Sequence, residues 1–373
     1  MRLYRISWFD EFECLGGKCP MSCCKGWQIP LTPEDCTRLR KERGRRGLAL
    51  FFATAGWSRA KFNNDSMSCP FWDRDGLCRL QKEKGHDFIP ETCRDFPRFY
   101  RNYGPFEETY ADLSCIGAAR LFMKHIDDLT LVSSEGEPVT DLCTTNDDTS
   151  YLEFLVSTRQ QMIRAAVSSA ADGSFWTYCD TLYEYACDVQ DKMTNVTEGT
   201  VIFDTFSRNY RCNMHYHKMC QKEPSLLSHF LNSPLRHRHL KTVNPMLYDM
   251  FEAADKHLAK CRKEGRSVGG NVPDERVHKI CAAYLSYYLY MHFLRTYETY
   301  GIRKQIALGI VHVNMIYLLI NANCDGDRVT DEQIARIIAA YNGRAYFNDH
   351  ILDEMYKIFE NAVTDKSAYP GMS

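Results

Sequence analysis

The sequence predicts a mainly α-helical protein in which a small, metal-stabilised, cysteine-rich N-terminal domain with a short β-hairpin precedes an α-helical domain. Nine of the 17 cysteines fall within the first 115 of the 373 residues. A polar stretch at residues 133–150, rich in Ser, Thr, Asp, Gly and Pro, is typical of a linker or long loop. Helical apolar spacing dominates after it. We therefore expect a metal- or iron–sulfur-binding domain at residues 1–130 and a helical domain at residues 151–373.

Composition predicts a sizeable core and argues against a nucleic-acid partner. A length of 373 residues exceeds the usual single domain, and 45% hydrophobic residues are ample for a core. The net charge of −2 and a pI near 6.6 provide no global basic field, so we expect no nucleic-acid partner.

The apolar segments predict neither secretion nor a membrane span. The start, MRLYRISWFDEF, lacks the apolar run of a secretory signal, which favours a cytoplasmic protein. The longest apolar run, residues 306–320, is too short for a bilayer and contains His312 and Asn314. In a reducing cytoplasm, concentrated cysteines indicate metal binding or catalysis rather than disulfides.

The first region begins with a cysteine-rich loop and a helix. Residues 12–29, FECLGGKCPMSCCKGWQI, hold four cysteines. A helix should begin near Pro33, with Thr32 as its N-cap and Asp35 as capping-box partner. Its polar face is basic and is interpreted as solvated, although it suits an acidic or phosphate partner as well. The basic residues are Arg38, Arg40, Lys41, Arg43, Arg45 and Arg46.

Three further segments supply the other cysteines. Residues 68–80, SCPFWDRDGLCRL, predict a hairpin around an Asp-Gly turn that brings Cys69 and Cys78 together. Cys93 lies in PETCRDFPRFY, and Cys115 opens the helical pattern CIGAARLFMKHI. Ligands would thus come from four separate segments of the chain.

Thiolates are soft ligands that select zinc, copper(I) or iron–sulfur clusters. The spacing Cys19-x3-Cys23-Cys24 is neither a zinc-ribbon C-x2-C nor the C-x3-C-x2-C of radical enzymes, because Gly26 stands at the third position. Adjacent Cys23 and Cys24 point apart and should serve different roles. The cysteines can form two sites, or one site plus reactive or packed thiols, or can in part be small buried hydrophobes.

Four blocks in order resemble the flagellin lysine-N-methylase family, among the wider cysteine-cluster proteins described as zinc- or iron-chelating. They are Cys14-x4-Cys19-x3-Cys23-Cys24-Lys25-Gly26-Trp27, CPFWDRDGLCRLQKEKG, TCRDFPRFY and SCIGAARLF. The resemblance covers roughly the first 125 residues. Beyond the linker it weakens to a helical character and a C-terminal element, YNGRAYFNDH, in which the extra Gly343 departs from the family form.

This resemblance implies a cytoplasmic protein-lysine N-methyltransferase that uses S-adenosylmethionine, acts on flagellin and carries a cysteine-ligated iron–sulfur cluster, of the 4Fe-4S type, with zinc as the alternative. Cys36 lies outside the shared blocks. The implied metal ligands are Cys14, Cys19, Cys23, Cys24, Cys69, Cys78, Cys93 and Cys115.

The residues alone do not indicate methyl transfer. No strand with a G-x-G-type turn predicts a Rossmann-like cofactor site, so the catalytic and cofactor-binding residues stay unassigned. A methyl acceptor pocket could use aromatic and acidic residues of the matched blocks, although such aromatics suit a core and such acids suit ion pairs with Arg94 or Arg98. These residues are Trp27, Trp72, Phe96, Asp95, Glu107 and Asp112.

The second region predicts helices at residues 154–170, 276–295, 306–322 and 349–363. The stretch Tyr284 to Phe293 is apolar nearly all round, as in a central buried helix, and its tyrosines suit a core or, alternatively, a lysine or adenine pocket. His312 should be a satisfied core histidine. In RCNMHYHKMC, Cys212, His215, His217 and Cys220 are ligands by type, but helical spacing would not bring them together.

Three functions fit these observations. The first is the flagellin methyltransferase, and the second is a non-catalytic metal-binding or redox-sensing protein with a partner-docking helical domain. The third is a methylase of another lysine-bearing protein. Binding of S-adenosylmethionine separates the first and third from the second.

Overall fold

The computed structural model describes residues 1–21, 23–24, 29–41, 61–62, 69, 71–73, 75–195, 204–210, 224–236, 240–269, 272–324, 329–346 and 349–364. It is mostly helical with a small sheet, which confirms the mainly α prediction. The strands are β1 (Arg2–Ile6), β2 (Ile29–Pro30), β3 (Lys61–Phe62), β4 (Arg98–Asn102), β5 (Phe106–Ala111) and β6 (Leu131–Glu135).

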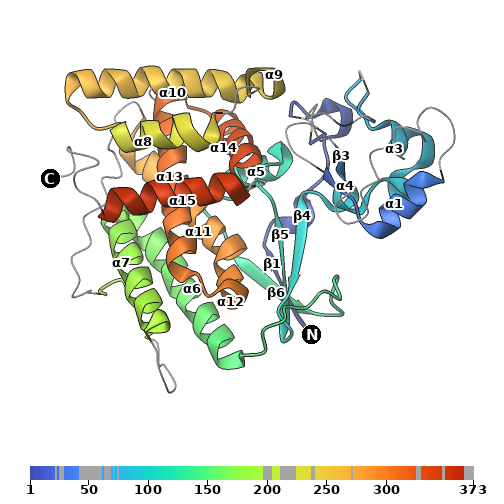
Figure 1. Cartoon of the computed structure of the whole chain (residues 1–373), viewed down its shortest axis with the longest axis horizontal. Helices are drawn as coiled ribbons and strands as arrows, with labels where there is room; N and C mark the ends of the chain where they lie inside the picture. Colours follow the sequence, from blue (N-terminus) through green and yellow to red (C-terminus); the bar gives the residue numbers. More distant parts are fainter. Residues whose placement is uncertain are drawn as a thin grey trace.

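The helices fall into a cysteine-rich group and a larger group, which Figure 1 shows on opposite sides of the sheet. The first group is α1 (Pro33–Arg40), α3 (Arg79–Lys84) and α4 (Glu91–Asp95). The larger group is α5 (Ile116–Lys124), α6 (Thr149–Ala171), α7 (Phe175–Thr194), α8 (Pro224–Phe230), α9 (Leu240–Val243), α10 (Pro245–Glu264), α11 (Asp274–His292), α12 (Thr296–Thr299), α13 (Ile302–Asn323), α14 (Asp331–Ala345) and α15 (Asp349–Thr364).

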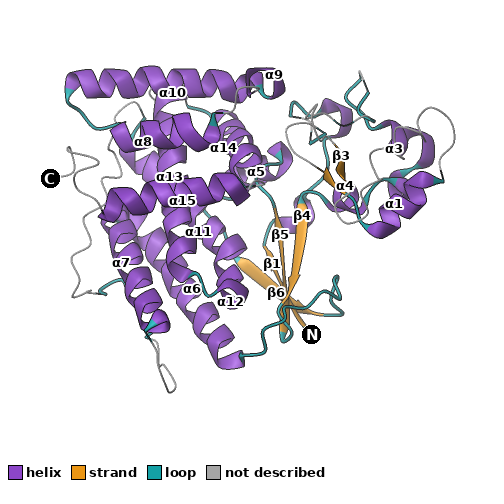
Figure 2. Ribbon diagram, in the orientation of Figure 1, coloured by secondary structure: helices purple, strands orange, loops and turns teal. Residues whose placement is uncertain are grey.

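The main sheet has the order β4-β5-β1-β6, and Figure 2 shows it as the strand layer beside the helices. Strand β1 runs parallel to β5, with Arg2 opposite Phe106, and antiparallel to β6. Strands β4 and β5 form an antiparallel hairpin. Gly104 in its turn adopts φ 90°, a conformation that a side chain disfavours, and its N–H donates to Asn102 Oδ1 (2.9 Å).

The sequence did not predict this sheet. One reason is that strand β5, in its interior, carries charged residues at buried positions. Glu107 accepts hydrogen bonds from the backbone N–H groups of Val139 and Thr140, at 3.0 to 3.1 Å. Glu108 forms an ion pair with Arg159 of α6, and both side chains are under 5% exposed. Since these partners lie far along the chain, local spacing gave no strand signal.

The helix predictions for the second region are confirmed at α6, α11, α13 and α15. Helix α11 is buried over almost its whole length, as expected of a central helix. It joins the sheet to the helical layer, because the Tyr287 and Tyr290 hydroxyls donate to the carbonyls of Ala111 (2.7 Å) and Thr109 (3.0 Å) in β5. Trp8 stacks on Tyr287 with ring centroids 5.9 Å apart.

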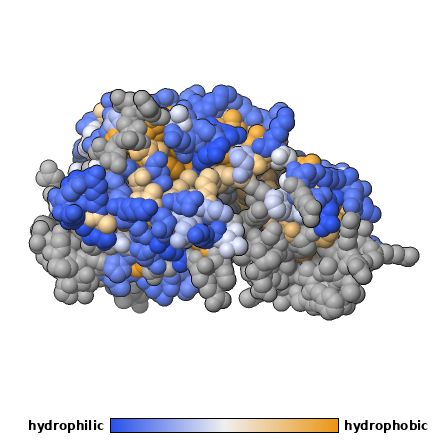
Figure 3. Space-filling view, turned by 90° about the horizontal axis from the view of Figure 1, so that it is seen from above, coloured by the Kyte–Doolittle hydropathy of each residue, from blue (hydrophilic) through white to orange (hydrophobic). Residues whose placement is uncertain are grey.

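Helix α13 is the one helix of the described ranges that is long and apolar enough to cross a membrane. However, 89% of its apolar window is buried inside the fold, which is typical of a core helix. Figure 3 shows a face whose described surface is largely hydrophilic, with pale orange, apolar atoms near its middle.

The cysteine-rich region confirms one local prediction and changes another. Helix α1 begins at Pro33, and Thr32 and Asp35 form the predicted capping box. The predicted hairpin is reduced to an isolated antiparallel bridge between Trp72 and Cys78. The start of the predicted linker, residues 133–135, is the end of strand β6 in the structure. The division into domains at residues 130 and 151 stays a prediction.

Candidate functional site

The eight cysteines of the resemblance lie at turns and helix starts. Cys14 and Cys19 flank a 3-10 turn (Gly16–Lys18), and Cys24 lies in the turn that follows. Cys78 and Cys115 are the N-cap residues of α3 and α5. Burial raises the pKa values of both thiols, and hydrogen bonds from backbone N–H groups of the first helical turn offset part of this rise. Such N–H donors also stabilise sulfur ligands of a metal.

Four of these cysteines belong to a small second core, which we call the small-core thiols. They are Cys24, Cys69, Cys78 and Cys93, which pack with Ile29, Leu39, Phe71, Leu80 and Ile89. The Cys69 N–H donates to the Cys24 carbonyl (2.8 Å), which holds the two segments together. The thiols of Cys24 and Cys69 form a hydrogen bond that, with burial, raises the pKa of Cys69. Burial raises the pKa values of Cys78 and Cys93.

The other four cysteines do not belong to the small core, and we call Cys14, Cys19, Cys23 and Cys115 the sheet-side thiols. Cys19 and Cys115 pack against the main core, and the thiols of both lie close enough to Cys14 to interact with it electrostatically. Burial raises the pKa of Cys115 to about 11 and also raises that of Cys19. Cys23 links the groups, because its thiol forms a hydrogen bond with the thiol of Cys24 and lies near Cys93 and Cys115, which with burial raises its pKa. The expectation that Cys23 and Cys24 point apart is therefore wrong, because the turn brings the two neighbouring thiols together.

The donor set suits a soft metal in type and number. Eight thiols on four segments match the ligand chemistry of zinc or iron–sulfur sites. The raised pKa values of Cys19, Cys23, Cys69 and Cys93 mean that these four thiols are protonated without a metal, whereas a bound cation would deprotonate them. Within the described part of the chain, no three His, Cys, Asp or Glu side chains are grouped as a metal site.

The aromatic and acidic residues proposed for an acceptor pocket do not share one place. Trp72 packs on the small core, while Glu107 is bound by backbone donors of the loop after β6. Asp112 accepts from the Ser114 N–H (2.7 Å), and Asp95 pairs with Arg94 (3.5 Å). Trp27 lies outside the described residues, as do Cys212, His215, His217 and Cys220.

Residues of the basic run and of the C-terminal element YNGRAYFNDH have partners in the structure. In the basic run, Arg38 donates to Asp35 and to the Ile89 carbonyl (3.0 Å), so it links α1 to the chain before α4. Arg344 donates through Nε to the Leu235 carbonyl (3.0 Å). His350 is exposed and lies 3.4 Å from Glu354.

A second constellation, which we call the aromatic–imidazole cluster, includes tyrosines that the sequence predicts as core, with a lysine or adenine pocket as the alternative. It comprises Tyr284, Tyr288 and His292 of α11, His312 of α13, and Tyr341, Asn342 and Tyr346 at the end of α14. The ring of Tyr346 is 4.6 Å from His312 and 5.1 Å from His292. The i, i+4 spacing of Tyr284, Tyr288 and His292 was the available signal, but core helices share it.

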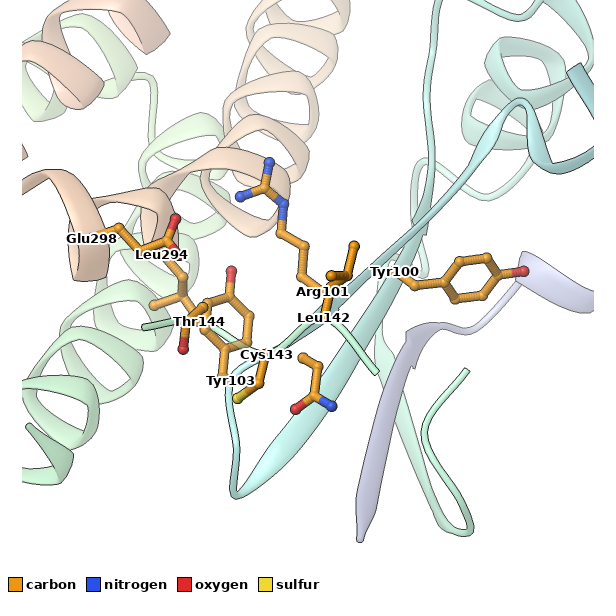
Figure 4. A pocket seen from close by; sticks show the side chains of 9 residues that line it. Tyr100, Arg101, Tyr103, Leu142, Cys143, Thr144, Leu294 and Glu298 are labelled. Atoms are coloured by element: carbon orange, nitrogen blue, oxygen red, sulfur yellow. The ribbon is translucent and has the colours of Figure 1, made fainter. Parts of the chain in front are cut away.

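A surface pocket of about 200 Å³ opens near the C-terminal end of α11. Its walls include Arg101 and Tyr103 of the β4–β5 hairpin, Cys143 and Leu294. In Figure 4 the Arg101 guanidinium extends toward the helices, whereas the Tyr100 ring points the other way. Arg101 Nε donates to the Tyr110 hydroxyl (2.9 Å).

Comparison with known proteins finds relatives but no matching family profile and no matching solved structure. The chain is 30% identical over 116 residues to two proteins named lysine-N-methylase, from Salmonella choleraesuis (strain SC-B67) and Salmonella typhimurium (strain LT2). These alignments cover 28% of this chain and 28% of each relative. The chain thus spans well under two thirds of their length.

A third relative, the flagellar biosynthetic protein FliU of Salmonella muenchen, is also 30% identical over 116 residues. Here the alignment covers 28% of this chain and 67% of the relative. Together with the ordered cysteine blocks, this coverage shows that the chain belongs to the family of FliU and the flagellin lysine-N-methylases.

Proposed function

We propose that this protein is an S-adenosylmethionine-dependent protein-lysine N-methyltransferase that acts on flagellin and holds a cysteine-ligated iron–sulfur cluster. The observation that carries the proposal is membership in a family whose relatives are named for lysine methylation and for flagellar biosynthesis. The thiol groups support the metal part, since six of the eight cysteines lie in or pack against one of two cores, and Cys23 is hydrogen-bonded to Cys24 of the small core.

The reaction needs a neutral amine. The lysine ε-ammonium must first lose a proton, and then its nitrogen lone pair forms the N–C bond to the methyl group. The methyl C–S bond breaks with its electron pair going to sulfur, which leaves a neutral thioether. A buried, weakly polar site favours this proton loss, because burial disfavours the charged ammonium.

The small-core thiols are the better candidates for a closed site, because four sulfurs sit on one apolar cluster. The sheet-side thiols include Cys14, which is exposed, so this group has the more open surroundings. The iron ions of a bound cluster would keep their own ligating thiols deprotonated. Because the thiolate-ligated cluster as a whole is anionic, proton loss from the lysine would depend on burial of the ammonium.

Metal analysis tests the ligand assignment. Anaerobically purified protein should contain iron and sulfide, and Cys78→Ser should lower both. Cys143→Ser is the matched control, because Cys143 is an exposed thiol that belongs to neither thiol group. Zinc without sulfide would replace the iron–sulfur assignment by a zinc site, and unchanged iron and sulfide in Cys78→Ser would remove Cys78 from the ligand set.

The mass spectrum of flagellin tests the activity. Flagellin co-expressed with this protein should carry lysine peptides heavier by whole methyl units than flagellin expressed alone. Unchanged masses with a filled metal site would reject flagellin as the substrate. Methyl transfer to another lysine-bearing protein would then support a methylase of different specificity, whereas failure to bind S-adenosylmethionine would favour a metal-binding or redox-sensing protein.

A further inference from the structure

The aromatic–imidazole cluster combines stacked rings with polar atoms that have no partner. The Tyr288 ring lies 4.8 Å from His292, 5.5 Å from His312 and 6.1 Å from Tyr346. This approach depends on Gly309 of α13, because a Cβ there would lie 2.9 Å from the Tyr288 ring. The three helices α11, α13 and α14 therefore hold these aromatic faces close together.

Hydrogen bonds satisfy only part of the cluster. The Tyr284 hydroxyl donates to Asn342 Oδ1 (2.7 Å) and lies 2.5 Å from the Tyr346 hydroxyl. His312 Nδ1 pairs with the Tyr341 hydroxyl (2.7 Å). Among the described residues, however, no partner reaches His312 Nε2, His292 Nε2 or Asn342 Nδ2.

These orphaned atoms require an explanation, because buried polar groups in folded proteins nearly always have a partner. His312 and Asn342 are fully buried at 0% exposure. Burial lowers the pKa of His312 to about 3, so its imidazole is neutral at pH 7. A bound molecule that offers both a donor and an acceptor would satisfy the set.

Charges of both signs flank the cluster. Arg295 and Arg101 lie near His292 and, with burial, lower its pKa. On the other side, the buried Asp112 carboxyl lies near Tyr284. A zwitterion fits this arrangement better than a simple cation or anion, because its carboxylate can face the arginines while its amino group donates to a neutral imidazole nitrogen.

The cluster also adjoins both the surface pocket and the sheet-side thiols. The pocket wall includes Arg101 and Leu294, and Leu294 follows His292 by two positions. At the opposite end, a Cβ at Gly343 would lie 3.8 Å from the side chain of Ser114, the residue before Cys115. His292 and Tyr346 are partly exposed, whereas the other members are buried, so these two mark the side of entry.

We propose that the aromatic–imidazole cluster, with the adjoining pocket at Arg101, is the site that binds the methionyl end of S-adenosylmethionine. The methyl sulfonium would lie against the partly exposed Tyr346 ring, because aromatic faces attract such cations. The carboxylate would face Arg101, and the amino group would donate to an imidazole nitrogen. This inference rests on the proposed methyltransferase function and adds the location of its methyl donor.

The test is binding of S-adenosylmethionine carrying a ¹³C-labelled methyl group to the full-length protein, followed by NMR. Ring currents should shift the bound methyl resonance upfield. Tyr346→Leu should weaken binding about tenfold and reduce the shift, whereas Tyr346→Phe, which keeps the ring, should retain both. Tyr356→Leu is the matched control, because Tyr356 is also a partly buried tyrosine packed on the main core.

S-adenosylhomocysteine separates recognition from a general loss of structure, since it lacks the methyl group and the positive charge. The preference for the sulfonium over this thioether should fall in Tyr346→Leu and stay unchanged in Tyr356→Leu. If the wild-type protein binds S-adenosylmethionine and Tyr346→Leu keeps the same affinity and preference, the location is wrong while the methyltransferase function stands. If the wild-type protein does not bind it, the proposed function itself fails.

Discussion

Replacement of Glu108 by Gln should destabilise the protein strongly, because it leaves the Arg159 guanidinium buried without its counter-charge. The side chains of Arg159 and Glu108 are 3% and 4% exposed. Arg159 Nη1 donates to Glu108 Oε2 (2.8 Å), and Nη2 donates to Oε1. After the substitution, the Tyr290 carbonyl (3.2 Å) remains as an acceptor.

The magnitude follows from the environment of this pair. At an effective dielectric constant of about 20, two opposite charges at about 4 Å attract by about 4 kcal/mol. Removing one partner of a buried pair costs about 3–5 kcal/mol. We therefore expect the free energy of unfolding to fall by about 3 kcal/mol in Glu108→Gln.

Urea unfolding followed by circular dichroism measures this loss. The double variant Glu108→Gln/Arg159→Met should recover about 2 kcal/mol relative to the sum of the single variants, because no unpaired charge then stays buried. A loss below about 1 kcal/mol in Glu108→Gln, or simple additivity in the double variant, would refute the reasoning.

Two further predictions concern α14 and α13. The hydrogen bond from Arg120, with help from Arg336, lowers the pKa of Glu332 to about 2. Its contribution to stability is present above its ordinary pKa near 4.5 and is lost as the pH falls toward 2, so Glu332→Gln should flatten acid unfolding curves in that window. At pH 7 this half-exposed pair should contribute no more than about 1 kcal/mol. Gly309→Ala should reduce the free energy of unfolding by about 1–3 kcal/mol through overlap with the Tyr288 ring, and equal stability in thermal melts would contradict that packing.

Local signals predicted the elements that depend on neighbouring residues. The structure confirms the capping box of Thr32 and Asp35 and the helices α11 and α13. Each of these depends on residues only a few positions apart in the sequence. Strand β5 was missed because its two glutamates are satisfied by α6 and by the loop after β6, which no local window contains.

The candidate sites show the same limit. Cysteine density predicted a thiol-rich region, but the division into small-core and sheet-side groups depends on which core each segment joins. The aromatic–imidazole cluster was hidden, because tyrosines at helical spacing look alike in a core and in a binding site. Only the unpartnered atoms of His312 and Asn342 distinguish the two.

The parallel pairing of β1 with β5 has a consequence for metal affinity. Residues 7–97 leave the sheet after β1 and return to it at β4, which pairs with β5, so the sheet holds both ends of this segment close together. Closing a loop of roughly 90 residues costs about 4 kcal/mol of chain entropy. Once the sheet has formed, the thiols of this segment search a smaller volume, and their effective concentration for a shared metal rises. By the same linkage, a metal bound across these thiols would favour the closed sheet.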